Sequence, residues 1–194
     1  MQPRLTISMP CYKRPLRTAI AIECIKNQTM RDFQAVVAGD GCPTFKPVTD
    51  DGRFISFNTE ENRGGCGYWL TNYAIARATG KYFLFMGNDD FITPDHFARC
   101  LAAIEGTDLD FVWFPRVKVQ GKNHLFWLKS YHIGHCALII RTEFLKKMPP
   151  HVKEYNHDWH LIYAMIHAGA KFKRNWKKPT YHIDPYRWRG TDND

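Results

Sequence analysis

Residues 82–90 read Tyr-Phe-Leu-Phe-Met-Gly-Asn-Asp-Asp, an uncharged run that ends abruptly in one amide and two carboxylates. Open α/β sheets bind ligands at the carboxyl ends of their strands. Two adjacent carboxylates repel each other unless a cation compensates, and Mg²⁺ binds a few protein oxygens together with substrate phosphates. The stretch therefore predicts a metal–phosphate site. A solvated turn that caps the next helix is the alternative interpretation of Asn88, Asp89 and Asp90.

Short apolar runs alternate with helical stretches along the first half of the chain. The apolar runs are 5–9, 33–38, 54–57 and 82–86, and helices are expected from Pro15 and from Gly67. This alternation predicts β-α-β units, and hence an α/β fold with a mostly parallel central sheet flanked by helices.

Two helices carry recognisable start signals. The first has Pro15 at a plausible N1 position, and an apolar face that is expected to cover the sheet consists of Leu16, Ala19, Ile20 and Cys24. The second is expected to begin at Thr93 as the N-cap, followed by Pro94 at N1 and Asp95 in the first turn.

The second half of the chain has a more mixed pattern. Apolar runs occur at 110–119, 125–128 and 137–140, and a helix is expected over 157–168. We find no internal repeat, no low-complexity tract and no long Pro/Gly/Ser linker. The sequence therefore predicts one domain over residues 1–194, with two functional halves that divide at about residue 105.

Composition narrows the classes of partner and the compartment. The 27 Lys and Arg residues exceed the 19 Asp and Glu residues, which gives a net charge of +8 and favours an anionic partner. The six cysteines include no C-x-x-C pair, so reduced thiols in the cytoplasm are the simplest expectation. No leader is visible, and no apolar run approaches the roughly 20 residues that span a bilayer. At most peripheral membrane contact is expected.

Four motifs in order resemble those of family 2 glycosyltransferases. Residues 8–14 are similar to the family's P-T-Y-N-R turn, 36–41 to V-V-D-D-G, 62–64 to N-x-G, and 72–90 to R-N-x-G…A-x-G-x-Y…L-D-x-D-D. The resemblance covers about residues 4–105, with a further match near residue 158. It implies a single GT-A-like domain whose first half binds a nucleotide-sugar and whose second half binds the acceptor and carries the catalytic base.

The resemblance implies a role for each matched residue of the donor site. Tyr12 would stack on the base and Asp40 would accept a ring N–H, which suits uracil, while Asn88 would approach the ribose. Asp89 would bind Mn²⁺ or Mg²⁺ that bridges the diphosphate, with Asp90 a second candidate ligand and His182 a third. The full set implied to bind the donor is Pro10, Tyr12, Arg14, Asp40, Asn62, Gly64, Asn88, Arg187 and Arg189.

Two positions depart from the family pattern. Gly87 stands where the first acid of the D-x-D motif is usual, and Thr71 stands where an Arg often faces the diphosphate. The phosphate charge must then be met elsewhere. Arg14 is one candidate, and a loop that carries Arg187 and Arg189 is another, although arginines of this kind are also common on ordinary solvated surfaces.

The segment 155–161 resembles the family's E-D-x-x-L motif, with His157 in place of the Glu. Asp158 therefore matches the catalytic position. An inverting transfer needs one carboxylate to take the proton of the acceptor hydroxyl while the metal stabilises the departing diphosphate. The alternative for Asp158 is a structural acid in the first turn of a helix, after an Asn156 cap.

Together these matches imply a metal-dependent transfer of sugar from a nucleotide-sugar, expected to be UDP-linked, to an acceptor hydroxyl with inversion. The acceptor is expected to be a carbohydrate, a glycan or a lipid-linked molecule. Two other functions are weighed against this one. The segment 171–178 interleaves five basic residues with two aromatics, as a nucleic-acid-binding module does, but no specific nucleic acid is expected. A nucleotidyltransferase would need a Gly-rich, Lys-bearing N-terminal loop, which is missing.

Overall fold

The computed structural model describes residues 2–114, 116–118, 123–124, 135–154, 157–175 and 180–183. The central-sheet strands are β1 (Leu5–Cys11), β2 (Phe33–Gly39), β3 (Phe54–Asn58), β4 (Tyr82–Phe85), β6 (Phe111–Trp113), β9 (Leu138–Arg141) and β10 (Phe172–Arg174). The α-helices are α1 (Pro15–Lys26), α2 (Tyr68–Arg77), α3 (His96–Ile104), α4 (Thr142–Leu145) and α5 (His157–His167). Short 3-10 turns are η1 (Gly65–Gly67) and η2 (His135–Ala137).

The central sheet of the described part has the strand order β10-β6-β9-β4-β1-β2-β3. Neighbouring strands pair in parallel, except that β9 runs antiparallel to both β4 and β6. The expected α/β fold with a mostly parallel sheet is therefore confirmed. A smaller sheet joins β5 (Phe91–Ile92), β11 (Tyr181–Ile183), β7 (Arg116–Lys118) and β8 (Asn123–His124) in that order.

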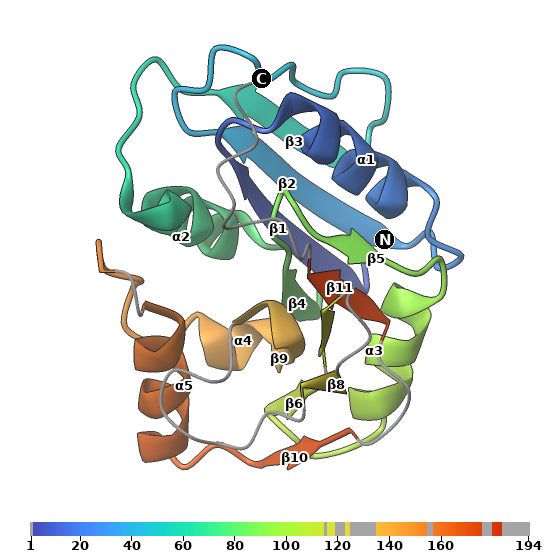
Figure 1. Cartoon of the computed structure of the whole chain (residues 1–194). Helices are drawn as coiled ribbons and strands as arrows, with labels where there is room; N and C mark the ends of the chain where they lie inside the picture. The colour runs from blue at the N-terminus through green and yellow to red at the C-terminus, as the bar shows by residue number, and fades with distance from the viewer. Residues whose placement is uncertain are drawn as a thin grey trace.

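Helices cover both faces of the central sheet, as Figure 1 shows. Side chains of α1 and α3 pack with Ile7 and Leu84 in one buried cluster. Side chains of α2, α4 and α5 pack with Phe83 and Phe85 in a second cluster. Because successive residues of a strand point to opposite faces, the apolar run of β4 supplies both clusters.

The expected face of α1 is wrong. Thr18, Ala21 and Ile25 are buried, whereas Leu16 is 69% and Ile20 is 48% exposed. Apolar residues lie all around this helix, so the sequence pattern did not distinguish one face from another. A hydrogen bond of Thr18 with the loop after β4 determines instead which face of the helix is buried.

The expected start of α3 is also wrong. The helix begins at His96 with Asp95 as the N-cap, and Thr93 lies before it. The Thr93 amide donates to the carbonyl oxygen of Thr180 at 3.0 Å, directly after β5 pairs with β11. Sheet pairing therefore holds Thr93 in an extended segment, while its hydroxyl donates to the Asp95 carboxylate at 2.5 Å.

The sequence predicts some of the remaining helices and strands correctly and others incorrectly. Helix α5 and strand β9 lie where the pattern predicts them, but the run 110–119 contains two separate strands, β6 and β7. These two belong to different sheets, so the chain crosses from one sheet to the other between them. The strand expected at 125–128 lies outside the described residues.

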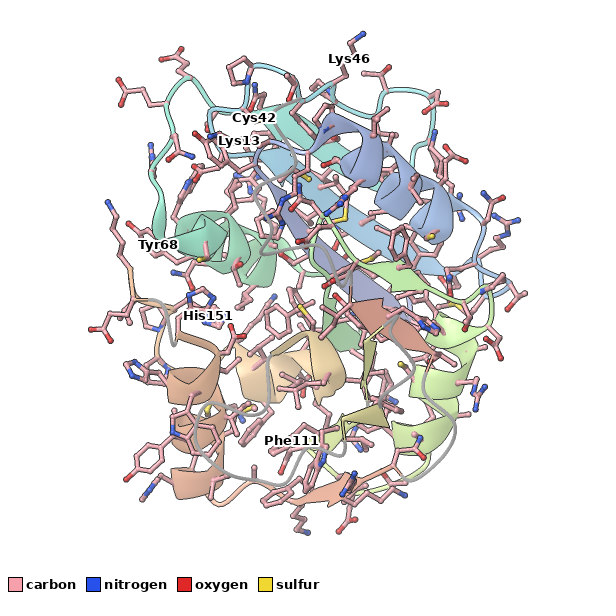
Figure 2. All side chains as sticks on the ribbon, viewed as in Figure 1. Lys13, Cys42, Lys46, Tyr68, Phe111 and His151 are labelled. Atoms are coloured by element: carbon pink, nitrogen blue, oxygen red, sulfur yellow. The ribbon has the colours of Figure 1, made fainter. Side chains whose placement is uncertain are left out.

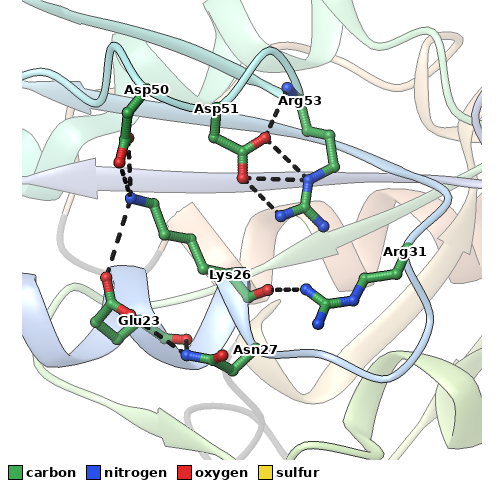
Figure 3. Close-up of polar contacts among 7 residues, drawn as sticks. All are labelled: Glu23, Lys26, Asn27, Arg31, Asp50, Asp51 and Arg53. Atoms are coloured by element: carbon green, nitrogen blue, oxygen red, sulfur yellow. Dashed lines mark hydrogen bonds and ion pairs between the residues drawn. The ribbon is translucent and has the colours of Figure 1, made fainter.

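Surface ion pairs tie the end of α1 to the loop before β3 (Figure 3). Lys26 Nζ lies 2.9 Å from Asp50, and Arg53 forms hydrogen bonds with Asp51. The Arg53 hydrogen bonds lower the pKa of Asp51 to about 2. The Arg53 guanidinium also lies over the ring of Phe33, the first residue of β2, so this network is at the opposite end of that strand from Asp40.

Candidate functional site

The carboxyl ends of β1, β2 and β4 meet at one edge of the central sheet, which we call the carboxyl edge. Cys11 pairs with Gly39 across β1 and β2, and the Asp40 amide donates to the Cys11 carbonyl at 2.8 Å. The Met86 amide donates to the Ser8 carbonyl at 2.9 Å. The turns that follow these three strands therefore lie side by side (Figure 1), and they carry Tyr12, Arg14, Asp40 and Asn88 of the residues expected to bind the donor.

The Asp40 carboxylate is buried and held by three donors. Its Oδ1 accepts from the Arg63 amide at 3.1 Å and from Trp69 Nε1 at 3.0 Å, and its Oδ2 accepts from Asn62 Nδ2 at 3.2 Å. The Arg63 guanidinium lies over the Trp69 ring, 4.2 Å from the centroid. Trp69 was missed by sequence reasoning. One sequence signal could have pointed to it: this tryptophan lies in the first turn of the helix that follows the Asn62–Gly64 motif.

Pro10, Tyr12 and Gly64 lie at the same edge of the sheet as Asp40. Tyr12 follows β1 and has a 44% exposed ring, as a stacking surface requires. A Cβ on Gly67 would lie 2.5 Å from the Pro10 Cβ, so Pro10 packs directly against the start of α2. Gly64 has a φ of +65° and precedes that same turn. The structure thus brings Pro10, Tyr12, Asp40, Asn62 and Gly64 to the carboxyl edge.

The loop Gly87–Asp90 folds tightly around its own carboxylates. Asp89 and Asp90 are each 1% exposed. A Cβ on Gly87 would lie 2.6 Å from Asp90 Oδ2, which gives a steric reason for glycine where the family usually has an acid. The Asp90 carboxylate folds back over Gly87.

Tyr181 of β11 braces this loop and was also missed by sequence reasoning. Its hydroxyl donates to Asp90 Oδ2 at 2.6 Å and accepts from the Gly87 amide at 3.0 Å. Burial and the nearby Asp90 carboxylate raise the pKa of Tyr181 well above its usual value, so the phenol remains a proton donor. No sequence motif links residue 181 to residue 90, because only the pairing of β11 with β5 brings them together.

Contacts with the start of α1 and the turn before it hold the loop Gly87–Asp90 from the other side. Arg14 Nη1 forms an ion pair and hydrogen bond with Asp89 Oδ2. The Asn88 side-chain amide donates to Thr18 Oγ1 at 2.8 Å and to the Lys13 carbonyl at 3.3 Å. Asn88 therefore connects the end of β4 to the start of α1, a structural contact that the expectation of a ribose contact did not include.

Asp89 and Asp90 offer the hard oxygen ligands that Mg²⁺ and Mn²⁺ accept. Within the described residues, no group of three or more His, Cys, Asp and Glu side chains could hold a metal ion. His182 neighbours Tyr181 on β11, and strand alternation directs its side chain to the opposite face from the Tyr181 hydroxyl. This loop therefore fits a metal ion that is bound by the two carboxylates and by the phosphates of a substrate. It fits less well a metal ion that is bound only by protein ligands.

Asp158 lies in the first turn of α5, and two ring contacts connect that turn to the carboxyl edge. The His157 ring centroid lies 5.2 Å from that of His151, which in turn lies 5.8 Å from that of Phe85, the last residue of β4. The backbone of His151 also exchanges two hydrogen bonds with the Asn72 side chain of α2, at 2.8 and 2.9 Å. Figure 2 shows His151 between α2 and α5.

His157 is buried and contacts Asp158 directly. Its Nε2 lies 3.0 Å from Asp158 Oδ1, and its Nδ1 lies 3.0 Å from the Glu154 carbonyl oxygen. The side chain of Asp158 is 31% exposed, so the carboxylate is held on one side and reachable from the other. This arrangement can orient a general base.

Some expected features lie elsewhere or outside the described residues. Arg187 and Arg189 lie outside them, as do residues 176–178 of the basic segment. In the described part of that segment, Phe172 stacks on Phe111 with ring centroids 4.8 Å apart, and Lys171 pairs with Asp108 at 2.9 Å. Phe172 is therefore partly buried, and its ring packs against the second core cluster. No described helix is both long enough and apolar enough to cross a membrane.

The fold is an α/β fold of the kind that binds ligands at the carboxyl ends of its strands, and here that edge carries a buried carboxylate pair. Residues 6–182 match the family model described as glycosyl transferase family 2. The chain belongs to this family, as its motifs implied, and its fold is GT-A-like. Family membership favours a glycosyltransferase over the nucleic-acid-binding and nucleotidyltransferase alternatives.

Curated relatives agree with this assignment. An uncharacterized glycosyltransferase of Rickettsia typhi is 25% identical over 196 residues, covering 88% of this chain and 61% of that protein. The succinoglycan biosynthesis protein ExoW of Rhizobium meliloti is 26% identical over 146 residues, covering 70% of this chain and 42% of that protein.

Solved structures share the fold at low identity. S. aureus TarS in complex with UDP has a TM-score of 0.74 at 18% identity, covering 93% of this chain and 60% of that one. A mannosyltransferase from Pyrobaculum calidifontis, in complex with GDP-Man and Mn²⁺, has a TM-score of 0.66 at 15% identity, covering 90% and 55%. The chain therefore spans 61% of the first relative and 60% of the first structure.

Proposed function

We propose that the chain is a metal-dependent glycosyltransferase that moves a sugar from a UDP-linked donor to an acceptor hydroxyl with inversion. This proposal rests on one observation: in a chain of this family, Tyr12, Asp40 and the Asp89–Asp90 pair lie at the same edge of the sheet. These are the groups needed for a base, a carboxylate-bound cation and a diphosphate.

The arrangement around Asp40 supports uracil as the base. Trp69 Nε1 and the Arg63 amide both donate to one oxygen of the Asp40 carboxylate and so fix its orientation. An oriented acceptor suits the ring N–H of uracil. The neighbouring Tyr12 ring is exposed enough to stack on the face of the base. TarS, a structural neighbour, has been solved with UDP and with UDP-GlcNAc.

Asp89 and Asp90 would hold Mn²⁺ or Mg²⁺, which when bound neutralises the diphosphate leaving group. A neighbour solved with GDP-Man and Mn²⁺ supports this assignment. His182 is retained only as an additional candidate ligand. Thr71 is buried and uncharged where the family often has an Arg, so the remaining phosphate charge falls to Arg14, with Arg187 and Arg189 as further candidates.

Asp158 is proposed to be the general base. It would take the proton from the acceptor hydroxyl as that oxygen attacks the anomeric carbon from the side opposite the diphosphate, which inverts the configuration. His157, anchored on the Glu154 carbonyl, contacts Asp158 Oδ1 and so holds the carboxylate in place. The link through His151 to the end of β4 supports a position near the donor.

The acceptor is proposed to be a carbohydrate, a glycan or a lipid-linked molecule, in keeping with a relative described as a succinoglycan biosynthesis protein. A cytoplasmic location with at most peripheral membrane contact is proposed as well. The six free thiols are in keeping with a reducing compartment.

A thermal-shift and hydrolysis panel tests this function. UDP, UDP-GlcNAc, GDP and GDP-mannose are each added with and without Mn²⁺, and ligand at 100 times its Kd should add about 2.7 kcal/mol of stability. We expect stabilisation by uridine nucleotides only with Mn²⁺, and loss of the metal-dependent part in Asp89→Asn. Asp50→Asn, which removes an exposed carboxylate in the surface network of Figure 3, is the matched control. Equal stabilisation by all nucleotides, or stabilisation independent of Mn²⁺, would contradict the proposal.

A further inference from the structure

The turn that precedes α1 has an unusual backbone. Lys13 has a φ of 56° and Arg14 a φ of 58°, so two successive non-glycine residues adopt the left-handed conformation. This conformation is unfavourable for residues that carry a Cβ, and it persists only where the surrounding structure imposes it. Such turns concentrate at functional sites.

Four hydrogen bonds impose this conformation. The Lys13 amide donates to Cys42 Sγ at 3.1 Å, and the Thr18 amide donates to the Arg14 carbonyl at 2.9 Å. Asn88 Nδ2 donates both to the Lys13 carbonyl at 3.3 Å and to Thr18 Oγ1 at 2.8 Å. The turn is therefore fastened to β4, to α1 and to the turn after β2 at the same time.

This fastening directs the Arg14 guanidinium at Asp89. Arg14 Nη1 contacts Asp89 Oδ2, and the two side chains are 26% and 1% exposed, respectively. A carboxylate as buried as that of Asp89 is costly to keep charged unless an opposite charge is nearby. In the structure Arg14 supplies that charge, at the carboxylate that a divalent cation would need.

We propose that Arg14 acts as a stand-in for the metal ion. In the ligand-free protein it neutralises Asp89, and it moves to the diphosphate when the cation and the nucleotide bind. This inference rests on the proposed function, because it takes the Asp89 carboxylate as the cation site. The consequence is that divalent cation and nucleotide bind cooperatively.

The cooperativity follows from competition for one carboxylate. A cation that arrives without nucleotide must compete with Arg14 for the Asp89 carboxylate, so its affinity is low. A cation that arrives with a diphosphate offers Arg14 two new acceptor oxygens, which a guanidinium can bind in a bidentate manner. Coupling of this kind is reciprocal, so the cation must strengthen nucleotide binding by the same factor.

Mn²⁺ titrations with and without saturating UDP, followed by calorimetry or by the EPR signal of free Mn²⁺, measure this coupling without an activity assay. For the unmodified protein we expect UDP to tighten Mn²⁺ binding by about 5- to 150-fold, the usual range for coupled sites. In Arg14→Gln, Mn²⁺ alone should bind more tightly than in the unmodified protein, and UDP should tighten Mn²⁺ binding by a smaller factor, which reflects only the contact of the cation with the diphosphate.

Two further variants separate geometry from charge. Thr18→Val changes no charge but removes the hydroxyl that accepts a hydrogen bond from Asn88, so it should loosen the turn. The affinity for Mn²⁺ alone should then rise, but by less than in Arg14→Gln. Arg31→Gln removes an equal charge from an exposed loop at the other end of the sheet, where Arg31 contacts the Lys26 carbonyl (Figure 3), and should change neither affinity. If Thr18→Val behaves like the unmodified protein while Arg31→Gln resembles Arg14→Gln, net charge is the cause and the proposal is wrong.

The failure of this inference and that of the proposed function give different results. If Mn²⁺ and UDP bind and Asp89→Asn abolishes the metal dependence, but Arg14→Gln leaves the affinity for Mn²⁺ alone unchanged, then only the role of Arg14 is refuted. If the unmodified protein binds UDP without any response to Mn²⁺, the metal-dependent function itself is refuted, and this inference with it.

Discussion

Asp90 accepts a hydrogen bond from Tyr181, whose hydroxyl also accepts one from the Gly87 amide. Tyr181→Phe removes one oxygen and leaves two buried polar groups without that partner, which costs about 1–3 kcal/mol of unfolding free energy. Urea denaturation measures the loss. We also expect weaker binding of UDP with Mn²⁺, because the loop that carries Asp89 and Asp90 loses its brace.

Tyr82→Phe is the matched control for this prediction. Tyr82 is fully buried like Tyr181, but its hydroxyl has no hydrogen-bond partner within the described residues. Removal of that hydroxyl should be nearly neutral or stabilising. If the two tyrosine variants lose equal stability, the hydrogen bonds of Tyr181 do not brace the loop.

Asp158 provides a second test at the scale of one residue. Asp158→Asn retains size and hydrogen bonding but cannot take a proton, so kcat should fall by about 10²- to 10⁴-fold. UDP affinity in the presence of Mn²⁺ should change little, because the proposed donor-binding residues are Tyr12, Asp40 and Asp89 and do not include Asp158. Steady-state kinetics with a competent acceptor and UDP titrations provide the two measurements. A near-normal kcat, or a defect confined to KM, would argue against a general base.

Helix α1 shows how one contact sets the orientation of an element. The Asn88–Thr18 hydrogen bond joins the loop after β4 to the first turn of α1, and Thr18 is buried together with Ala21 and Ile25. Leu16 and Ile20 then face outward, although both are more hydrophobic than Thr18. The helix therefore has two apolar sides, and the buried one is selected by a polar contact.

A matched pair of alanine variants tests this rotation. Ile25 is fully buried and Ile20 is 48% exposed on the same helix, so both substitutions change helix propensity equally. Ile25→Ala should cost about 2–5 kcal/mol of unfolding free energy, as buried Ile-to-Ala substitutions do. Ile20→Ala should stay within about 0.5 kcal/mol, as for other surface substitutions. Chemical denaturation of both variants gives the comparison, and a reversed order would mean that the helix is rotated as the sequence pattern suggested.

The stability of the whole molecule should depend on pH through His96. This histidine is the first residue of α3 and is buried against β11, with Nδ1 2.7 Å from Thr180 Oγ1 and its ring centroid 5.8 Å from that of Tyr181. Burial lowers the pKa of His96 to about 3, whereas an unfolded histidine titrates near the ordinary value of 6.5. The folded state therefore keeps His96 neutral at pH values where the unfolded state binds a proton.

The sign of the effect follows from this difference. Above pH 6.5 neither state is protonated at this position, and the full stability is present. As the pH falls from 6.5 toward 3, the unfolding free energy should decrease, by up to about 1.4 kcal/mol per pH unit from this residue alone. Urea denaturation of His96→Gln between pH 7.5 and about 4.5 should show a shallower pH dependence than the unmodified chain. Equal slopes would contradict the burial of a neutral imidazole.

Several features of the fold were predictable from the sequence because they depend on local patterns. The uncharged run 82–86 predicted a buried strand, and the alternation of apolar runs with helices predicted the mostly parallel sheet. Motif spacing predicted which residues follow strand ends, and parallel strands bring those ends to one edge. Pro15 correctly marked the start of α1.

The sequence alone therefore determined the family, the class of fold and the edge of the sheet that carries the candidate site. Only the tertiary structure decided how the carboxylates of that site are held. Trp69 on Asp40, Arg14 on Asp89 and Tyr181 on Asp90 each join residues between 29 and 91 positions apart. Strand pairing and helix rotation create such contacts, and these depend on the packing of the whole chain. For the same reason the buried face of α1 and the start of α3 were not predictable from local pattern.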